Sequence, residues 1–191
     1  MPEVYLASRS PRRAELLQTL GVDFRIVDVN IDEAVRAGEI PADYVLRLAA
    51  AKAAAGQAQV PPGSAVLAAD TCVVIDNEII GKPRDRLDAM ALLQRLSGQW
   101  HEVLTGVALT VATTATVCVT TRVRMRRLTY REIAAYWGSG EPVDKAGAYG
   151  IQGLGGALVE RIEGSYSNVV GLPLAETLVL LDGARITHRL S

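Results

Sequence analysis

Residues 5–17, YLASRSPRRAELL, contain in order a short apolar strand, a polar loop and the beginning of a helix. Ser10 belongs to the residue types that cap helix N-termini, and Pro11 suits the first helical position because its missing N–H needs no partner there. Gly21 is placed to end the helix after one apolar stripe. The stretch therefore predicts a strand–loop–helix unit, which is typical of an α/β fold.

The loop and the first helical turn of this unit predict an anion site. Arg12 and Arg13 fall in the first turn, where the positive end of the helix dipole disfavours cations. Arg9 and the hydroxyl of Ser8 lie in the preceding loop. Backbone N–H groups at a helix start bind phosphate readily, and guanidinium groups strengthen that binding. We expect these side chains to gather around a phosphate. The alternative is that the arginines are ordinary solvated charges.

Strand and helix patterns mix along the rest of the chain, which predicts an α/β fold in a single domain over residues 1–191. The apolar run at 65–75 predicts a central strand that is buried on both faces. A Gly-rich loop is expected at 138–156. Further strands are expected at 4–7, 24–29, 78–80, 101–111, 116–125 and 157–162, and further helices at 41–58, 85–96, 130–137 and from 173.

Composition and motif spacing exclude several classes of protein. A net charge of −1 provides no basic field to attract nucleic acid or anionic lipid. No apolar stretch is long enough to span a bilayer, and there is no signal-peptide pattern. Cys72 and Cys118 lie in apolar runs and are interpreted as reduced core thiols, consistent with the cytoplasm. The chain has no CxxC, HExxH or GxSxG spacing, which argues against a structural zinc site, a zinc protease and a serine hydrolase.

A carboxylate in the middle of the central apolar run is the second strong feature. Asp70 would be costly to bury without a cation, a metal or a hydrogen-bond network, although it could also bond a neighbouring loop. Lys52 falls on the apolar stripe of the 41–58 helix and is a candidate partner, or else a lysine whose amine reaches water. Asp32 and Glu33 form a carboxylate pair that could help to hold a divalent ion or could be solvated.

Two later loops complete the candidate site. Lys82 lies in a Gly–Lys–Pro turn that holds it more firmly than a helix surface would, although a solvated charge is the alternative. Residues 144–156, DKAGAYGIQGLGG, contain glycines that allow the backbone to approach a ligand closely. Gln152 could present its amide to the edge of a base, or the loop could be a rigid turn cluster without a ligand. Together the features predict metal-assisted hydrolysis of a phosphorylated small molecule.

These motifs together resemble those of the Maf family. The resemblance runs nearly end to end and in the right order. It implies a mixed, elongated β-sheet flanked by helices, like that of the inosine triphosphatases of the Ham1 type. It also implies a cytoplasmic nucleoside triphosphate pyrophosphatase that uses a divalent metal cation, Mg²⁺ or Mn²⁺. We expect a nucleoside triphosphate substrate, no nucleic-acid or membrane partner, and a homodimer. The segments that carry the resemblance are ASRSPRR at 7–13, ADT at 69–71, GKP at 81–83, LSG at 96–98 and DKAGAYGIQG at 144–153.

The form of the 144–153 segment resembles the subgroup that acts on dTTP and UTP, whereas a sister subgroup acts on 7-methyl-GTP. By position, the resemblance implies that Asp70 is the proton acceptor and that Glu33 lies near the phosphate and the metal. Asp70 either accepts the proton of the attacking water or helps Glu33 to hold the metal, and the sequence does not separate these two roles. Arg9 departs from the family, because many members have a small residue there. The implied substrate-binding residues are Ser8, Arg12, Arg13, Lys52, Thr71, Lys82 and Gln152, of which Arg12, Thr71 and Gln152 match positions linked to base selection.

The sequence also allows two other functions. The Maf family is associated with arrest of septum formation, so the chain could be a nucleotide-binding regulator of cell division without significant catalysis. It could also be a broad house-cleaning pyrophosphatase for modified purine nucleotides. Nucleotide binding without pyrophosphate release would favour the regulator. Comparable turnover of inosine triphosphate would favour the house-cleaning enzyme.

Overall fold

A mixed β-sheet forms the centre of the computed structural model, which describes residues 2–191. The strands are β1 (Val4–Leu6), β2 (Phe24–Ile26), β3 (Ala65–Ile75), β4 (Glu78–Ile80), β5 (Trp100–Thr110), β6 (Thr114–Met125) and β7 (Val159–Glu163). Their order is β2-β1-β3-β5-β6-β7, and β4 pairs with β3. Strand β1 is parallel to β2 and β3, whereas the β3–β4 and β6–β7 pairs are antiparallel. The predicted mixed sheet is confirmed.

The predicted helices are present, with ends that agree to within one or two residues. They are α1 (Pro11–Thr19), α2 (Pro41–Gln57), α3 (Arg86–Leu96), α4 (Tyr130–Gly138) and α6 (Leu174–Gly183). Helices α3 and α4 begin with side-chain caps: Asp85 accepts the N–H of Asp88 at 2.9 Å before α3, and Thr129 and Glu132 make a reciprocal capping box before α4. None of the helices in residues 2–191 has the length and apolar character needed to cross a membrane.

The pattern missed several short elements. Helix α5 (Tyr166–Val170) was not expected. The region predicted as a Gly-rich loop contains three 3₁₀ helices: η1 (Glu141–Asp144), η2 (Ala146–Ala148) and η3 (Leu154–Leu158). Elements this short have too few residues to show an apolar period, which is why the sequence does not reveal them.

The chain divides into two compact units, each made of separate segments. Unit 1 comprises Met1–Asp70, Thr105–Val119 and Gly171–Ser191, and unit 2 comprises Thr71–Leu104 and Thr120–Val170. A single domain over residues 1–191 stays a prediction.

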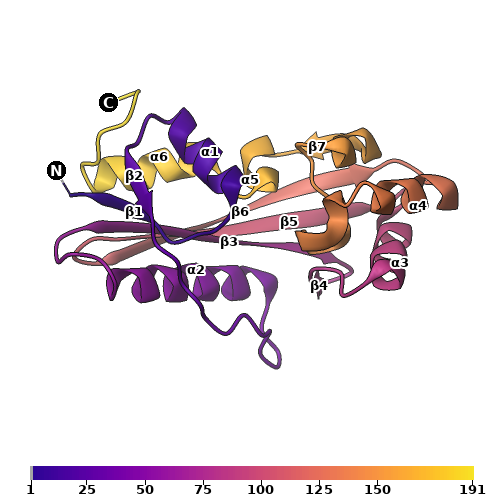
Figure 1. Ribbon diagram of the computed structural model, residues 1–191, viewed down its shortest axis with the longest axis horizontal. Coiled ribbons are helices and arrows are strands. Elements are labelled where there is room, and N and C mark those ends of the chain that lie inside the picture. Colours follow the sequence, from indigo (N-terminus) through magenta and orange to yellow (C-terminus); the bar gives the residue numbers. More distant parts are fainter. Residues whose placement is uncertain (1) are drawn as a thin grey trace. The chain divides into compact units, whose positions relative to one another are not determined.

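In unit 1, α2 covers one face of the sheet, and α1 and α6 cover the other (Figure 1). Strand alternation explains this arrangement, because successive side chains point to opposite faces. Leu6 and Leu67 pack with α1 and α6, whereas Val66 packs with the alanines of α2. Helix α2 lies very close to β5, since a Cβ at Gly106 would be 2.5 Å from the carbonyl oxygen of Val45. The position of α2 is therefore tightly fixed.

In unit 2, α3 and α4 pack with the 3₁₀ helices around one apolar core. Leu93, Leu96, Met125 and Ile133 are fully buried there. Leu128, which precedes the cap of α4, and Ile133 in its first turn are both buried members of this core, as in a hydrophobic staple.

Candidate active site

The N-terminal turn of α1 forms largely as the sequence predicts. Ser10 caps the helix by accepting the N–H of Arg13 at 3.5 Å. The Arg13 side chain is anchored twice: its Nε donates to the carbonyl oxygen of Gly171 at 2.8 Å, and its Nη1 donates to Oγ of buried Ser8 at 3.3 Å. The guanidinium group of Arg13 is thereby fixed beside the start of the helix.

The pKa of Arg13 depends on its burial and on the charged groups near it. Burial lowers the pKa of Arg13 below its ordinary value, and the nearby Arg12 acts in the same direction. The carboxylates of Asp70 and Glu33 act in the opposite direction. Arg12 buries its Nε atom, which has no hydrogen-bond partner among residues 2–191. Arg13 therefore lies near the buried carboxylate of Asp70, and Arg12 lies near Arg13.

The prediction that three guanidinium groups converge is wrong for Arg9. Its Nε lies 3.3 Å from Oδ1 of Asp28, and both side chains are largely exposed. Residue 28 follows β2, which pairs with β1, so this carboxylate lies close to the loop that carries Arg9. Arg9 therefore makes a solvent-exposed ion pair and not the expected contact with a phosphate.

Lys52 joins two carboxylates in unit 1. Its Nζ lies 2.6 Å from Oδ1 of Asp70 and 2.6 Å from Oε1 of Glu33. The side chains of Lys52 and Asp70 are 12% and 10% exposed, whereas that of Glu33 is 47% exposed. The predicted Lys52–Asp70 partnership is confirmed. The two carboxylates flank one ammonium group at the edge of the protein interior, where water can reach Glu33.

The other three predicted site residues belong to unit 2. Thr71 follows Asp70 directly in β3, so the two side chains point to opposite sides of the strand. Lys82 and Gln152 are exposed. The turn that carries Lys82 meets the Gly-rich segment, because Gly81 accepts the N–H of Gly147 at 3.1 Å. Two motifs that are far apart in the sequence are therefore neighbours within this unit.

Sequence reasoning missed Glu141, which anchors the segment around Gln152. Its carboxylate accepts the N–H groups of Leu154 and Gly155 at 2.8 and 3.0 Å, and the hydroxyl of Tyr136 at 2.7 Å. Burial raises the pKa of Glu141, but these hydrogen bonds outweigh it and leave the pKa below its ordinary value. Its partners are mainly backbone groups, which give no signal in the sequence.

His101 also supports the Gly-rich segment. Its Nε2 lies 2.7 Å from the hydroxyl of Tyr149. Burial lowers the pKa of His101 to about 4, so the ring is uncharged near neutral pH. His101, the second residue of β5, therefore makes a structural contact in unit 2.

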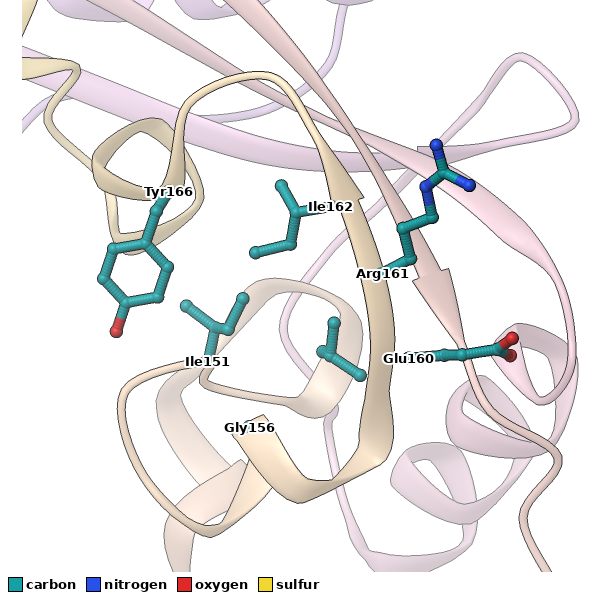
Figure 2. A pocket seen from close by; sticks show the side chains of 7 residues that line it. Ile151, Gly156, Glu160, Arg161, Ile162 and Tyr166 are labelled. Carbon is teal, nitrogen blue, oxygen red and sulfur yellow. The ribbon is translucent and has the colours of Figure 1, made fainter.

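A cavity of about 390 Å³ lies beside β7 in unit 2. Figure 2 shows the side chains of Ile151, Ile162 and Tyr166 gathered there. None of the predicted site residues lines this cavity. The cavity therefore shares no lining residue with the cluster of Lys52, Asp70 and Glu33.

Comparison with known proteins gives the family. Residues 3–184 match the family model described as Maf-like protein. The chain belongs to the Maf family. Maf-family relatives named dTTP/UTP pyrophosphatase cover nearly the whole chain. The relative from Hahella chejuensis is 58% identical over 182 residues, which are 92% of this chain and 89% of that one. The Vibrio cholerae relative is 53% identical over 180 residues, or 94% and 96% of the two chains.

Another similar Maf protein, from Escherichia coli O157:H7, also carries the name dTTP/UTP pyrophosphatase. It is 52% identical over 183 residues, which are 95% of this chain and 93% of that one. Among solved structures, that of the Staphylococcus aureus Ham1 protein is similar with a TM-score of 0.48 and 14% identity, covering 64% of this chain and 71% of that chain.

The carboxylates of Glu33 and Asp70 are the candidate ligands of a divalent cation in this Maf chain. In residues 2–191 no group of three or more His, Cys, Asp or Glu side chains is arranged to hold a metal ion. Mg²⁺ commonly binds one or two carboxylates and takes its other ligands from water and substrate phosphates. Glu33 and Asp70 supply two carboxylates around one cationic group. The pair fits a cation that arrives with phosphate, and not a cation held by protein ligands alone.

Proposed function

We propose that this chain is a nucleoside triphosphate pyrophosphatase that hydrolyses dTTP and UTP to the nucleoside monophosphate and pyrophosphate. Membership of the Maf family and relatives at 52–58% identity with the name dTTP/UTP pyrophosphatase support the proposal. The observation that carries it is the cluster of Lys52, Asp70 and Glu33 in unit 1. Together with the arginine-bearing start of α1, this cluster offers charges of both signs for phosphate chemistry.

The proposed reaction is an in-line hydrolysis. A water oxygen forms a bond to the α-phosphorus, the bridging bond between the α- and β-phosphates breaks, and pyrophosphate leaves. Asp70 accepts the proton of the attacking water, through the oxygen that is not bonded to Lys52. Lys52 and Arg13 neutralise charge that develops on the phosphate oxygens. Ser8 keeps Arg13 oriented through its hydrogen bond.

A divalent cation, Mg²⁺ or Mn²⁺, would be held by Asp70 and Glu33, and when bound it supplies positive charge that polarises phosphate oxygens. Lys82 is proposed as a further phosphate ligand, and Thr71 and Arg12 as contacts to the nucleoside. The homodimer and the cytoplasmic location implied by the family resemblance stay predictions.

A panel of nucleotides tests the proposed function. The wild-type chain is incubated with canonical and modified nucleoside triphosphates in Mg²⁺, and pyrophosphate release is measured. We expect dTTP and UTP to be the best substrates, and we expect release to stop in EDTA and return with Mg²⁺ or Mn²⁺. Nucleotide binding without pyrophosphate release would instead support a regulatory protein. Inosine triphosphate turnover equal to that of dTTP would support a broad house-cleaning enzyme.

Gln152 is proposed to read the base. An amide can match adjacent acceptor and donor groups on thymine or uracil. Gln152→Ala is therefore expected to lower kcat/KM for dTTP and UTP about three- to tenfold, as for the loss of one hydrogen bond, and to lower residual GTP hydrolysis less. The same substitution at Gln94, which is exposed on α3, is the control and should leave both values unchanged. An equal loss on every nucleotide would show that Gln152 does not read the base.

A further inference from the structure

Glu33 lies on a segment that has no regular structure of its own. Residues 27–40 connect β2 to α2 and contain neither a helix nor a strand. Most of these residues are exposed. A carboxylate on such a segment loses conformational freedom when it binds a ligand, which weakens binding unless other contacts already hold the backbone. The contacts that hold this segment therefore bear on the proposed role of Glu33.

Helix α2 supplies these contacts through two side chains. The hydroxyl of Tyr44 donates to the carbonyl oxygen of Glu33 at 3.1 Å. Nη2 of Arg47 donates to the carbonyl oxygen of the next residue, Ala34, at 3.0 Å. The carbonyl oxygens of two consecutive residues are thus hydrogen-bonded to side chains of the same helix. Tyr44 and Arg47 are one turn apart, and the guanidinium carbon lies 5.6 Å from the centre of the Tyr44 ring.

Glu39 fixes the position of Arg47. The guanidinium group makes two hydrogen bonds to the Glu39 carboxylate, Nε to Oε1 at 2.5 Å and Nη2 to Oε2 at 2.7 Å. The Arg47 and Glu39 side chains are only 19% and 8% exposed. Oε2 of Glu39 also accepts the N–H of Arg36 at 3.0 Å. A bidentate pair with little exposure holds its geometry better than a single surface contact, so the segment is clamped at both Ala34 and Glu39.

Hydrogen bonds from Arg47 are the main reason that the pKa of Glu39 falls to about 2. The carboxylate therefore stays ionised over the pH range in which nucleotide hydrolysis is measured, and the clamp persists throughout. Helix α2 also carries Lys52, which binds the Glu33 carboxylate itself. One helix thus orients both the backbone and the side chain of Glu33.

We propose that Tyr44 and Arg47, with Glu39 as the partner of Arg47, are positioning residues that hold Glu33 ready for the divalent cation. The inference rests on the proposed function, because Glu33 is a cation ligand only if the chain hydrolyses a metal–nucleotide complex. Neither side chain needs to touch the cation or the nucleotide. Their effect is to lower the metal concentration at which the site fills.

The test compares Tyr44→Phe and Arg47→Gln with the wild type at saturating dTTP. The Mn²⁺ concentration for half-maximal rate should rise about three- to tenfold in each variant, as for the loss of one or two hydrogen bonds. At saturating Mn²⁺, kcat should stay within about twofold. Mn²⁺ binding in the presence of a non-hydrolysable dTTP analogue, followed by electron paramagnetic resonance, should weaken by the same factor. Thermal melting of each variant is measured in parallel.

Matched controls are Tyr130→Phe, which removes a hydroxyl from an exposed tyrosine on α4, and Arg84→Gln, which breaks the surface pair with Asp88. Both should keep the wild-type metal dependence. Arg47→Gln leaves the Glu39 carboxylate without its guanidinium partner and can melt early, but Tyr44→Phe keeps the ring and removes the hydroxyl that donates to the carbonyl oxygen of Glu33. Tyr44→Phe therefore tests the positioning role even if Arg47→Gln is unstable.

Glu33→Gln separates the two ways in which the inference can fail. If Glu33→Gln weakens Mn²⁺ binding but Tyr44→Phe does not, the positioning role is wrong and the metal role of Glu33 stands. If Glu33→Gln also binds Mn²⁺ normally, the proposed metal role is wrong and the positioning role falls with it. Early melting of Arg47→Gln with normal Mn²⁺ binding would show a purely structural clamp.

Discussion

Asp70→Asn is expected to lower kcat for pyrophosphate release from dTTP by about 10²- to 10⁴-fold, the usual contribution of general-base catalysis. The asparagine keeps the size of the side chain and an oxygen that can accept the hydrogen bond from Lys52, which lies 2.6 Å from Oδ1. It removes the negative charge and the ability to accept a proton. Because Lys52 keeps Glu33 as an ionised partner and the fold loses little volume, melting should change far less than activity.

Single-turnover rates and thermal melting should be measured on the same preparation of this variant. Asp76→Asn is a suitable control, because Asp76 is an exposed aspartate just after the end of β3. It should leave the rate unchanged. Activity of Asp70→Asn within a few-fold of the wild type would remove Asp70 from the mechanism.

Lys52→Met is expected to damage both stability and turnover. The methionine keeps an unbranched chain of similar length, but no ammonium group remains between Asp70 and Glu33. Breaking a buried pair by removing one partner typically costs about 3–5 kcal/mol. Most of this cost should come from Asp70, since Glu33 is half exposed and water screens its charge. The rate should fall as well, because a cation that stabilises phosphate charge is lost.

Added Mg²⁺ distinguishes the loss of charge between the two carboxylates of Lys52→Met from simple misfolding of the variant. In the wild type the ammonium group of Lys52 already lies between the two carboxylates, so Mg²⁺ without nucleotide should change its melting temperature little. In Lys52→Met this charge is missing, and a cation that binds the folded state stabilises it by mass action, so Mg²⁺ alone should raise the melting temperature of this variant. Lys145→Met is the control, because Lys145 lies in unit 2 and contacts Glu141 and Asp144 instead. Wild-type melting and turnover in Lys52→Met would contradict the proposed cluster.

The sequence predicts the centre of the candidate site because its signals are local. Lys52 recurs with the apolar residues of α2 at helical spacing, so a charged group on a buried face could be expected. Asp70 interrupts a strand that is otherwise apolar, so a partner for it could be expected. The Ser10 cap likewise depends only on residues one turn apart. Periodicity and burial cost are properties of short segments, and both predictions are confirmed.

The remaining contacts depend on which distant segments meet. Arg9 pairs with Asp28 because β2 lies beside β1, and nothing in residues 5–17 specifies that neighbour. Glu33 contacts Lys52 because a segment without any apolar period folds back over α2. The partners of Glu141 include backbone N–H groups, which every residue except proline possesses. Such pairings require the assembled fold and cannot be predicted from local pattern.

The hydrogen bond from Arg13 to the carbonyl of Gly171 has a consequence for how the protein is made. The apolar residues beneath α1 also pack with Leu172 and Leu181. On the ribosome, a nascent chain that stops before residue 171 carries the N-terminal motif but lacks the contact that fixes its arginine. Closing so long a loop is slow compared with forming local structure. A segment synthesised long before residue 171 therefore reaches its working geometry only after that residue has been added.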